Sequence, residues 1–168
     1  MPGDFDAIRA VVAAAFRSSV EADLVDAIRA SPEHIPELSL VATVDDVIVG
    51  HVMVSDAAIA HDGAHRRIAM LSPLAVAPGA EKQGIGSALV REVMRLADER
   101  GEPAVILEGS PVFYGRLGFE PATPLDIHIP LPDWAPSEAA QVMRLSRYDP
   151  SLRGQVIYPA AFHAVTDH

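Results

Sequence analysis

The segment that most constrains the fold joins an apolar run to the longest amphipathic stretch of the chain, through a turn that contains glycines. Residues 68–76 are apolar enough for a strand, and residues 85–100 place apolar side chains at helical spacing. Gly84 and Gly86 lie where the helix begins, so free backbone N–H groups and the helix dipole favour an anion there. The segment is either a turn that binds a phosphate or diphosphate, or a plain tight turn between strand and helix.

Two familiar phosphate loops do not match this turn. A P-loop requires a lysine and then a serine or threonine directly after its last glycine, but Gly84 is followed by Ile85 and Gly86. A dinucleotide-binding fingerprint requires a third glycine, and Leu89 stands at that position. Both classes of loop are excluded.

Pro73 interrupts the apolar run before the turn. Proline cannot donate a hydrogen bond to a sheet, so one side of this strand is expected to be unpaired, bulged or splayed. One interpretation is an edge strand with a kink. The other is a strand whose free backbone groups pair with an extended ligand that is not protein.

The rest of the chain alternates helical and extended patterns. Asp45 and Asp46 are expected to form a hairpin turn, and the prolines after Pro121 indicate irregular chain. We expect helices from about residues 4 and 20, strands at 38–44, 47–54 and 104–107, helices at 85–100 and 112–117, and short strands near Ile127 and Val142. This order predicts an α/β (α+β) protein with one domain over residues 1–168.

Composition narrows the classes of function. Thirteen basic and 23 acidic residues give a net charge of −10, which disfavours nonspecific binding to nucleic acid. The chain has no cysteine, so disulfides, thiolate nucleophiles and cysteine-based zinc sites are excluded. Its first residues lack the pattern of a signal peptide, and no apolar stretch could span a bilayer. We therefore expect a cytoplasmic protein with no membrane partner.

Two motifs resemble those of one enzyme family. Leu74-Ala75-Val76-x-Pro78 followed by Gly84-Ile85-Gly86-Ser87-Ala88-Leu89-Val90 resembles the acetyl-CoA signature of the GNAT superfamily of N-acyltransferases. Downstream, the segment Gly109–Phe119 resembles the second signature of that family, with its F-Y-x-x-L-G-F pattern. The resemblance implies a GNAT-like mixed, mostly antiparallel central sheet flanked by helices. The family usually begins with a strand, whereas this chain enters a helix almost at once, so either that strand is absent or a different segment occupies its edge. An edge left exposed would be a candidate surface for a homodimer.

The resemblance also implies a role for individual residues, with acetyl-CoA as cosubstrate. Backbone groups of Leu74, Ala75 and Val76 would pair with the pantetheine arm. Tyr114 would protonate the departing thiolate, and an ordinary tyrosine pKa of about 10 keeps it protonated at neutral pH. Its alternative is a core aromatic beside its phenylalanine neighbours. The pyrophosphate would be held by the backbone amides of Lys82, Gln83, Gly84, Ile85, Gly86 and Ser87.

Two points within the resemblance stay open. Glu81 occupies a position where the family usually has glutamine or arginine, so a carboxylate would lie beside a diphosphate. Glu108, at the end of a strand, is the first candidate for the general base that deprotonates the attacking amine, with a solvated or ion-paired carboxylate as its alternative. His51 and His65 are weaker candidates.

Two further sets of residues have competing interpretations. His61 and His65 are spaced as metal ligands on a helix would be, but Asp62 and Gly63 indicate a turn, so no metal site is predicted. Trp134 lies in the proline-rich C-terminal part together with Tyr158 further on, and both are expected either to pack against the domain or to line an acceptor pocket.

The sequence thus predicts an enzyme that transfers an acetyl or other short acyl group from acetyl-CoA to a primary amine. The acceptor would be a small molecule or a peptide, and the amine would attack directly in a ternary complex. The alternative is a non-catalytic domain that binds acyl-CoA or regulates another protein.

Overall fold

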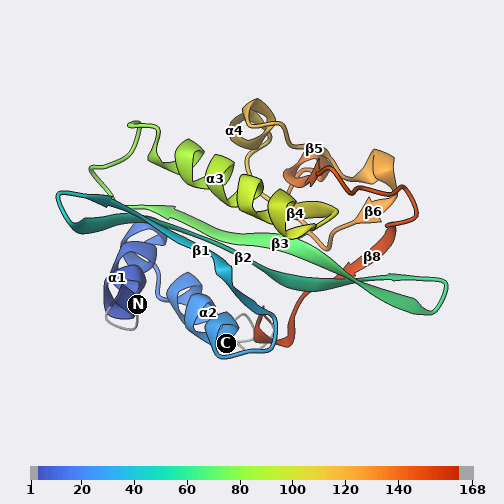
Figure 1. Cartoon of the computed structure of the whole chain (residues 1–168), viewed down its shortest axis with the longest axis horizontal. Coiled ribbons are helices and arrows are strands. Elements are labelled where there is room, and N and C mark those ends of the chain that lie inside the picture. Colours follow the sequence, from blue (N-terminus) through green and yellow to red (C-terminus); the bar gives the residue numbers. More distant parts are fainter. Residues whose placement is uncertain (1–3, 163–168) are drawn as a thin grey trace.

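The computed structural model describes residues 4–162 of the chain (Figure 1). Its helices are α1 (Phe5–Phe16), α2 (Val20–Arg29), α3 (Ile85–Arg100) and α4 (Pro111–Arg116), with short 3-10 helices at Thr123–Leu125 and Ser137–Ala139. Its strands are β1 (His34–Val44), β2 (Val47–His61), β3 (Ala64–Val76), β4 (Ala104–Glu108), β5 (Glu120–Pro121), β6 (Ile127–His128), β7 (Ala140–Arg144) and β8 (Gly154–Ile157). The elements expected from the sequence are all present, whereas β5 and β8 were not predicted.

Within residues 4–162 the strands form one mixed sheet in the order β5-β7-β4-β3-β2-β8-β6, with β1 also paired to β2. Most neighbours are antiparallel, and the parallel pairs are β3–β4 and β6–β8. Helices α3 and α4 lie on one face of the sheet and α1 and α2 on the other (Figure 1). The expected α/β architecture is confirmed.

Two strands share the outer side of the long strand β2. Its outer side pairs with β1 from Val47 to Ser55 and then with β8 from Ala58 to Ala60. Two segments far apart in the sequence therefore share one edge of β2. The outer edge of β1 remains without a strand partner in the described part of the chain.

Both hairpin turns follow from residues that tolerate a left-handed backbone. Asp45 and Asp46 join β1 to β2 with φ of 51° and 65°, and Asp62 and Gly63 join β2 to β3 with φ of 49° and 78°. Aspartate and glycine are favoured in such turns because they enter this conformation at low cost. The predicted turn at Asp45-Asp46 is confirmed, and so is the turn at Asp62-Gly63.

The predicted disturbance at Pro73 is also confirmed. The pairing of β2 with β3 shifts register between Val52 and Val54, directly opposite this proline. On its other side β3 pairs with β4 only at Ala69 and Met70, so the two parallel strands part beyond that point. The backbone of β3 from Leu71 onward is therefore free on the side that faces away from β2.

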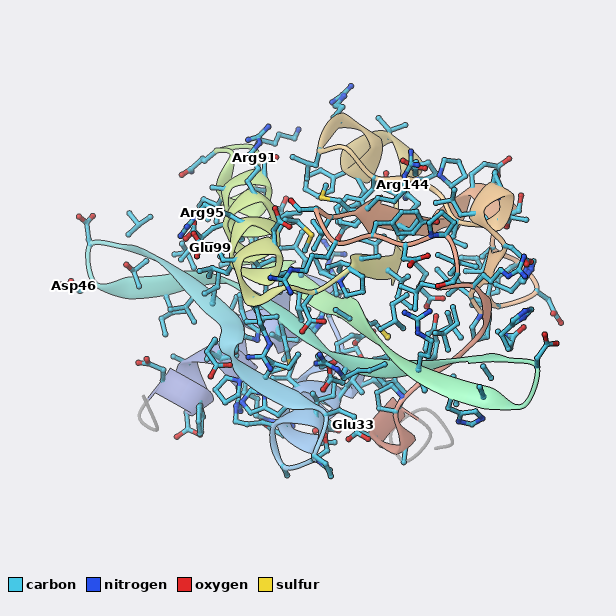
Figure 2. The ribbon with its side chains drawn as sticks, turned by 45° about the vertical axis from the view of Figure 1, so that its right-hand side comes forward. Glu33, Asp46, Arg91, Arg95, Glu99 and Arg144 are labelled. Carbon is cyan, nitrogen blue, oxygen red and sulfur yellow. The ribbon has the colours of Figure 1, made fainter. Side chains whose placement is uncertain are left out.

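Helix α3 covers its face of the sheet with an apolar stripe. Its buried side chains are Leu89, Val90, Val93, Met94 and Ala97. Complete removal of such a side chain from water stabilises the fold by roughly 1–3 kcal/mol. The opposite side is charged, and Figure 2 shows Arg91, Arg95 and Glu99 along it, with Arg95 paired to Glu99 at 2.6 Å. At the start of α3 Gly50 of β2 lets the helix approach closely, because a Cβ there would lie 3.0 Å from Ile85 and Leu89 atoms.

Alternation along the strands produces two separate cores. On the α1/α2 face the strands contribute residues such as Met53, Met70 and Ile106, and on the α3/α4 face their neighbours Val54 and Leu107. No helix in the described part of the chain is long and apolar enough to cross a bilayer.

Candidate active site

A cavity of about 320 Å³ opens where β3 ends and α3 begins. Its walls combine the freed end of β3, the glycine turn, the first turn of α3 and one aromatic side chain of α4. The lining residues are Leu74, Val76, Ala80, Glu81, Lys82, Gly84, Ile85, Gly86, Ser87 and Phe113. The splayed strand and the glycine turn thus border one space.

The backbone of the turn is shaped to present N–H groups. Lys82 and Gly84 both have a left-handed conformation, with φ of 64° and 78°. The hydrogen-bond ladder of α3 begins with the Ala88 N–H, which donates to the Gly84 carbonyl at 3.0 Å. The N–H groups before Ala88 precede the ladder, and such successive N–H groups form concave sites for anions.

Gly84 has a positive φ that favours glycine, whereas Gly86 does not. A Cβ at Gly86 would lie 3.5 Å from Phe113 Cζ and 3.6 Å from Val76 Cγ2, which are ordinary van der Waals distances, and its φ is not positive. The protein itself therefore has room for a side chain there, and that side chain would fill part of the cavity. Glycine at this position leaves the cavity open rather than relieving strain.

Seven of the nine predicted cofactor-binding residues line this cavity, and two do not. Ala75 is 2% exposed and points into the core of the α1/α2 face, because side chains alternate along β3. Gln83 is exposed at the outside of the turn. Glu81 and Lys82 both line the cavity and are exposed, so a negative and a positive charge lie side by side at its mouth.

Tyr114 lies on α4, with its ring in the core of the α3/α4 face. It is 9% exposed and makes edge-to-face contacts with Phe113 at 4.8 Å and with Phe119 at 5.5 Å between ring centroids. Burial raises the pKa of Tyr114 to about 12. The ring does not line the cavity, whereas the ring of Phe113, which it contacts, does.

Local sequence sets the position of this tyrosine. Ser110 caps α4, its hydroxyl accepting a hydrogen bond from the Phe113 N–H at 3.2 Å. Gly109 precedes the cap, and a Cβ there would lie only 2.7 Å from Tyr114 Cε2. Sequence reasoning missed this requirement, since the glycine is needed for a contact with a ring five residues away.

A second cavity, of about 370 Å³, lies at the end of β4. It is bordered by the segment that leads into α4 and by the proline-rich loop before β7. The lining residues are Glu108, Gly109, Ser110, Pro111, Leu131, Pro132, Trp134, Ala135, Pro136 and Ala139. Trp134 is 84% exposed and is therefore a wall of this cavity rather than a core residue.

Glu108 is partnered by a tyrosine rather than by a cation. The Tyr158 hydroxyl lies 3.2 Å from Glu108 Oε2 and 3.1 Å from the Pro130 carbonyl oxygen. Burial raises the pKa of Glu108, and the hydrogen bond from Tyr158 opposes that rise. Burial and the neighbouring carboxylate also raise the pKa of Tyr158. Among the described residues no cation pairs with Glu108, so the ion-paired alternative is wrong, whereas the solvated alternative agrees with its exposed position at the end of β4.

Register places the two ionisable side chains on opposite faces of the sheet. Glu108 follows the alternation of Ala104 and Ile106, which belong to the α1/α2 face, whereas Tyr114 belongs to the core of the α3/α4 face. A carboxylate and a phenol therefore flank the end of β4 from its two sides.

The histidines weighed as bases lie elsewhere. His51 is completely buried, its Nδ1 lies 2.9 Å from the Leu40 carbonyl oxygen, and burial lowers its pKa to about 4. His65 is exposed near the β2–β3 turn. His61 pairs with Asp62 at 3.3 Å, and residues 4–162 contain no cluster of three or more potential metal ligands.

Two curated proteins of Escherichia coli K12 resemble this chain in sequence. The N-acetyltransferase YhbS is 34% identical over 156 residues, which cover 92% of this chain and 88% of YhbS. The N-acetyltransferase YjhQ is 34% identical over 118 residues, which cover 70% of this chain and 65% of YjhQ.

Solved structures agree with these relatives. The crystal structure of YhbS in complex with CoA matches with a TM-score of 0.86 and 32% identity, over 97% of this chain and 88% of that one. A GNAT family acetyltransferase from Brucella melitensis in complex with acetyl-CoA matches with a TM-score of 0.77 and 30% identity, over 96% and 94%. The family model described as "Acetyltransferase (GNAT) domain" matches residues 2–122, and the chain belongs to this family of GNAT acetyltransferases.

Proposed function

We propose that this protein transfers an acetyl group from acetyl-CoA to a primary amine. The observation that carries the proposal is the single cavity formed by the freed end of β3 and the glycine turn of α3. Two relatives at 30% identity or more bind CoA or acetyl-CoA in their crystal structures. The residues here suit the same ligand.

Each part of the cavity suits one part of such a cosubstrate. The backbone of Leu74, Ala75 and Val76 would pair with an extended amide-bearing arm, since β4 has departed from that side of β3. The amides of residues 82–87 would hold a diphosphate, and Gly86 leaves the space it needs. When bound, acetyl-CoA supplies an acetyl group activated as a thioester.

Tyr114 is proposed as the general acid. The attacking amine forms a bond with the acetyl carbon while the bond to sulfur breaks, so a proton is needed by the departing thiolate. A pKa of about 12 keeps the Tyr114 phenol protonated at every physiological pH, as an acid must be before the reaction. Its ring contacts Phe113, which borders the cavity proposed for the thioester.

Glu108 is proposed to receive the proton that the amine loses. Its raised pKa makes it a stronger base than an ordinary glutamate, and the second cavity gives an amine access to it. Because Glu108 and Tyr114 flank β4 from opposite faces, the amine and the thioester would approach the same strand end from two sides. That arrangement supports direct transfer in a ternary complex.

Turnover and cofactor binding together test the proposal. Acetyl-CoA binding is measured by calorimetry, and CoA release is followed with a panel of primary amines. We expect saturable binding and amine-dependent CoA release. Acetyl-CoA binding with no CoA release for any amine of the panel would instead support a non-catalytic acyl-CoA-binding domain. The carboxylate of Glu81 at the cavity mouth is the feature that favours this alternative.

A further inference from the structure

The second cavity has a composition that selects among amines. Apart from Glu108 its walls are apolar or uncharged, and they come from two segments, residues 108–111 and residues 131–139. Pro111, Pro132 and Pro136 restrict the backbone of these walls, because proline fixes its own backbone angle. The volume of about 370 Å³ lies within the range typical of small-molecule sites.

Charge in this cavity has one sign. Glu108 is the one charged residue among those that line it, and no lysine, arginine or histidine is part of the wall. The Tyr158 hydroxyl has a single proton and two acceptors, Glu108 Oε2 at 3.2 Å and the Pro130 carbonyl at 3.1 Å. It therefore neutralises no charge, and Glu108 Oε1 remains able to accept a hydrogen bond from an ammonium group.

Trp134 extends the apolar wall toward solvent. Its indole is 84% exposed, whereas tryptophan side chains are on average largely buried. An exposed aromatic face beside a carboxylate suits a ligand with a flat apolar body and a cationic end. The ring stacks on the apolar body, and its face also attracts the cation.

We infer that the acceptor is a small primary amine with an apolar, preferably aromatic, body and no negative charge. This inference rests on the proposed function and names the substrate class of that same site. Glu108 would pair with the ammonium group, and Trp134 with Leu131 would cover the body. An amine that carries a carboxylate would place that charge against walls that offer no cation, and a diamine would bury its second charge against apolar side chains.

The only tryptophan of the chain provides a direct measurement of amine binding that does not depend on turnover. The protein, with saturating CoA, is titrated with three probes while Trp134 fluorescence is recorded. These are 2-phenylethylamine, its carboxylated counterpart phenylalanine, and putrescine, a diamine without an aromatic body. We expect 2-phenylethylamine to bind about tenfold or more tightly than either of the others. CoA release from acetyl-CoA is measured with the same three amines.

The outcomes separate this inference from the proposed function. No saturable fluorescence change with 2-phenylethylamine, or equal binding of phenylalanine or putrescine, would overturn the inference even if some other amine is acetylated. Selective binding of 2-phenylethylamine without any CoA release would support the inference about the site and overturn the proposed transfer.

Matched variants locate the effect. Glu108→Gln is expected to weaken 2-phenylethylamine binding about tenfold and to reduce the discrimination against phenylalanine, because the like charge is gone. Glu138→Gln removes an exposed carboxylate of the same loop outside the cavity wall, so binding should not change. Trp134→Ala, followed by calorimetry, should weaken the aromatic amine and leave putrescine unaffected, whereas Val112→Ala, at an exposed apolar residue outside the wall, should alter neither.

Discussion

The two faces of the sheet bury polar groups in different ways. On the α3/α4 face the buried Gln141 has a partner, its amide donating to the Gly109 carbonyl at 3.2 Å. On the α1/α2 face His51 Nε2 and Ser55 Oγ are buried without a hydrogen-bond partner among the described residues. An unsatisfied buried group costs about 1–3 kcal/mol, so the α1/α2 face gives up stability that the other face retains.

This difference follows the division of the proposed chemistry. The α3/α4 face carries the cavity proposed for the cosubstrate and the buried Tyr114, and its core is continuous from α3 to α4. The α1/α2 face carries Glu108 with Tyr158, and its interior includes titratable side chains. The α3/α4 face thus gives its buried polar group a partner beside the proposed cosubstrate cavity, whereas the α1/α2 face buries the ionisable His51 with no partner for its Nε2 among the described residues.

The largest expected effect concerns Tyr114 on the firmly packed face. Tyr114→Phe removes the proposed proton donor and keeps the ring contacts with Phe113 and Phe119. We expect kcat to fall by about 10²–10⁴-fold, the usual contribution of general acid catalysis. Calorimetry of acetyl-CoA binding is the control and should give an unchanged Kd. Unchanged kcat would show that Tyr114 is only a core aromatic.

The next effect concerns acid stability of the opposite face. His51 titrates near pH 6.5 in the unfolded chain, whereas burial, together with the charge of Arg29, lowers its pKa to about 4 in the fold. The unfolded state therefore binds a proton first, so the free energy of unfolding falls as the pH drops from 6.5 through 4, by about 3 kcal/mol.

Urea unfolding at a series of pH values measures this loss. In His51→Gln the same pH range should cost about 3 kcal/mol less, while the remaining decrease reflects other groups, including His34, whose pKa burial also lowers. Identical pH slopes in the two proteins would mean that His51 is not held neutral by the fold.

Alanine substitutions at Gly109 and Gly115, two glycines near Tyr114, are expected to have different and smaller effects. In Gly109→Ala the new Cβ would lie 2.7 Å from Tyr114 Cε2, so the ring must move, at a cost of about 1–3 kcal/mol in stability and with a lower kcat. Gly115→Ala, within α4, is the matched control, because no atom lies within 4 Å of the added Cβ. Thermal unfolding and kcat should change in the first variant and stay near wild type in the second. Equal behaviour of the two would refute the steric argument.

The smallest expected effect concerns Glu81 at the mouth of the cosubstrate cavity. Glu81→Gln removes a negative charge beside the proposed diphosphate site, so acetyl-CoA should bind about two- to fivefold more tightly at low salt. The gain should shrink at high ionic strength because salt screens exposed charges. Glu99→Gln, near the other end of α3, should leave the Kd unchanged. Weaker binding in Glu81→Gln would reverse the assignment of an unfavourable charge.

Much of the cosubstrate cavity could be predicted from the sequence because its parts are close together in the chain. Residues 74–87 supply nearly all of the wall, and each part carries a local signal: Pro73 for the splayed strand, glycines for the turn, and helical spacing for α3. Ala75 is the exception among the strand residues, since its side chain follows the alternation of β3 into the opposite core.

The acceptor side could not be predicted in the same way. Trp134 and Tyr158 were weighed both as packing residues and as a pocket lining, and no local pattern separates these choices. Tyr158 reaches Glu108 only because β8 pairs with β2 and brings the end of the chain across the sheet. The strand β8 itself was missed because four residues give too little alternation for a pattern.

By itself the sequence determined the order of the elements other than β5 and β8, both hairpin turns, the splayed strand and the glycine turn, since each depends on the backbone preferences of a few neighbouring residues. The tertiary structure alone decided which face each ionisable side chain occupies. It made Tyr158 the partner of Glu108, it made Gly109 necessary for Tyr114, and it buried His51 with a lowered pKa. These outcomes depend on desolvation and on contacts between segments far apart in the chain, and no local residue pattern records either one.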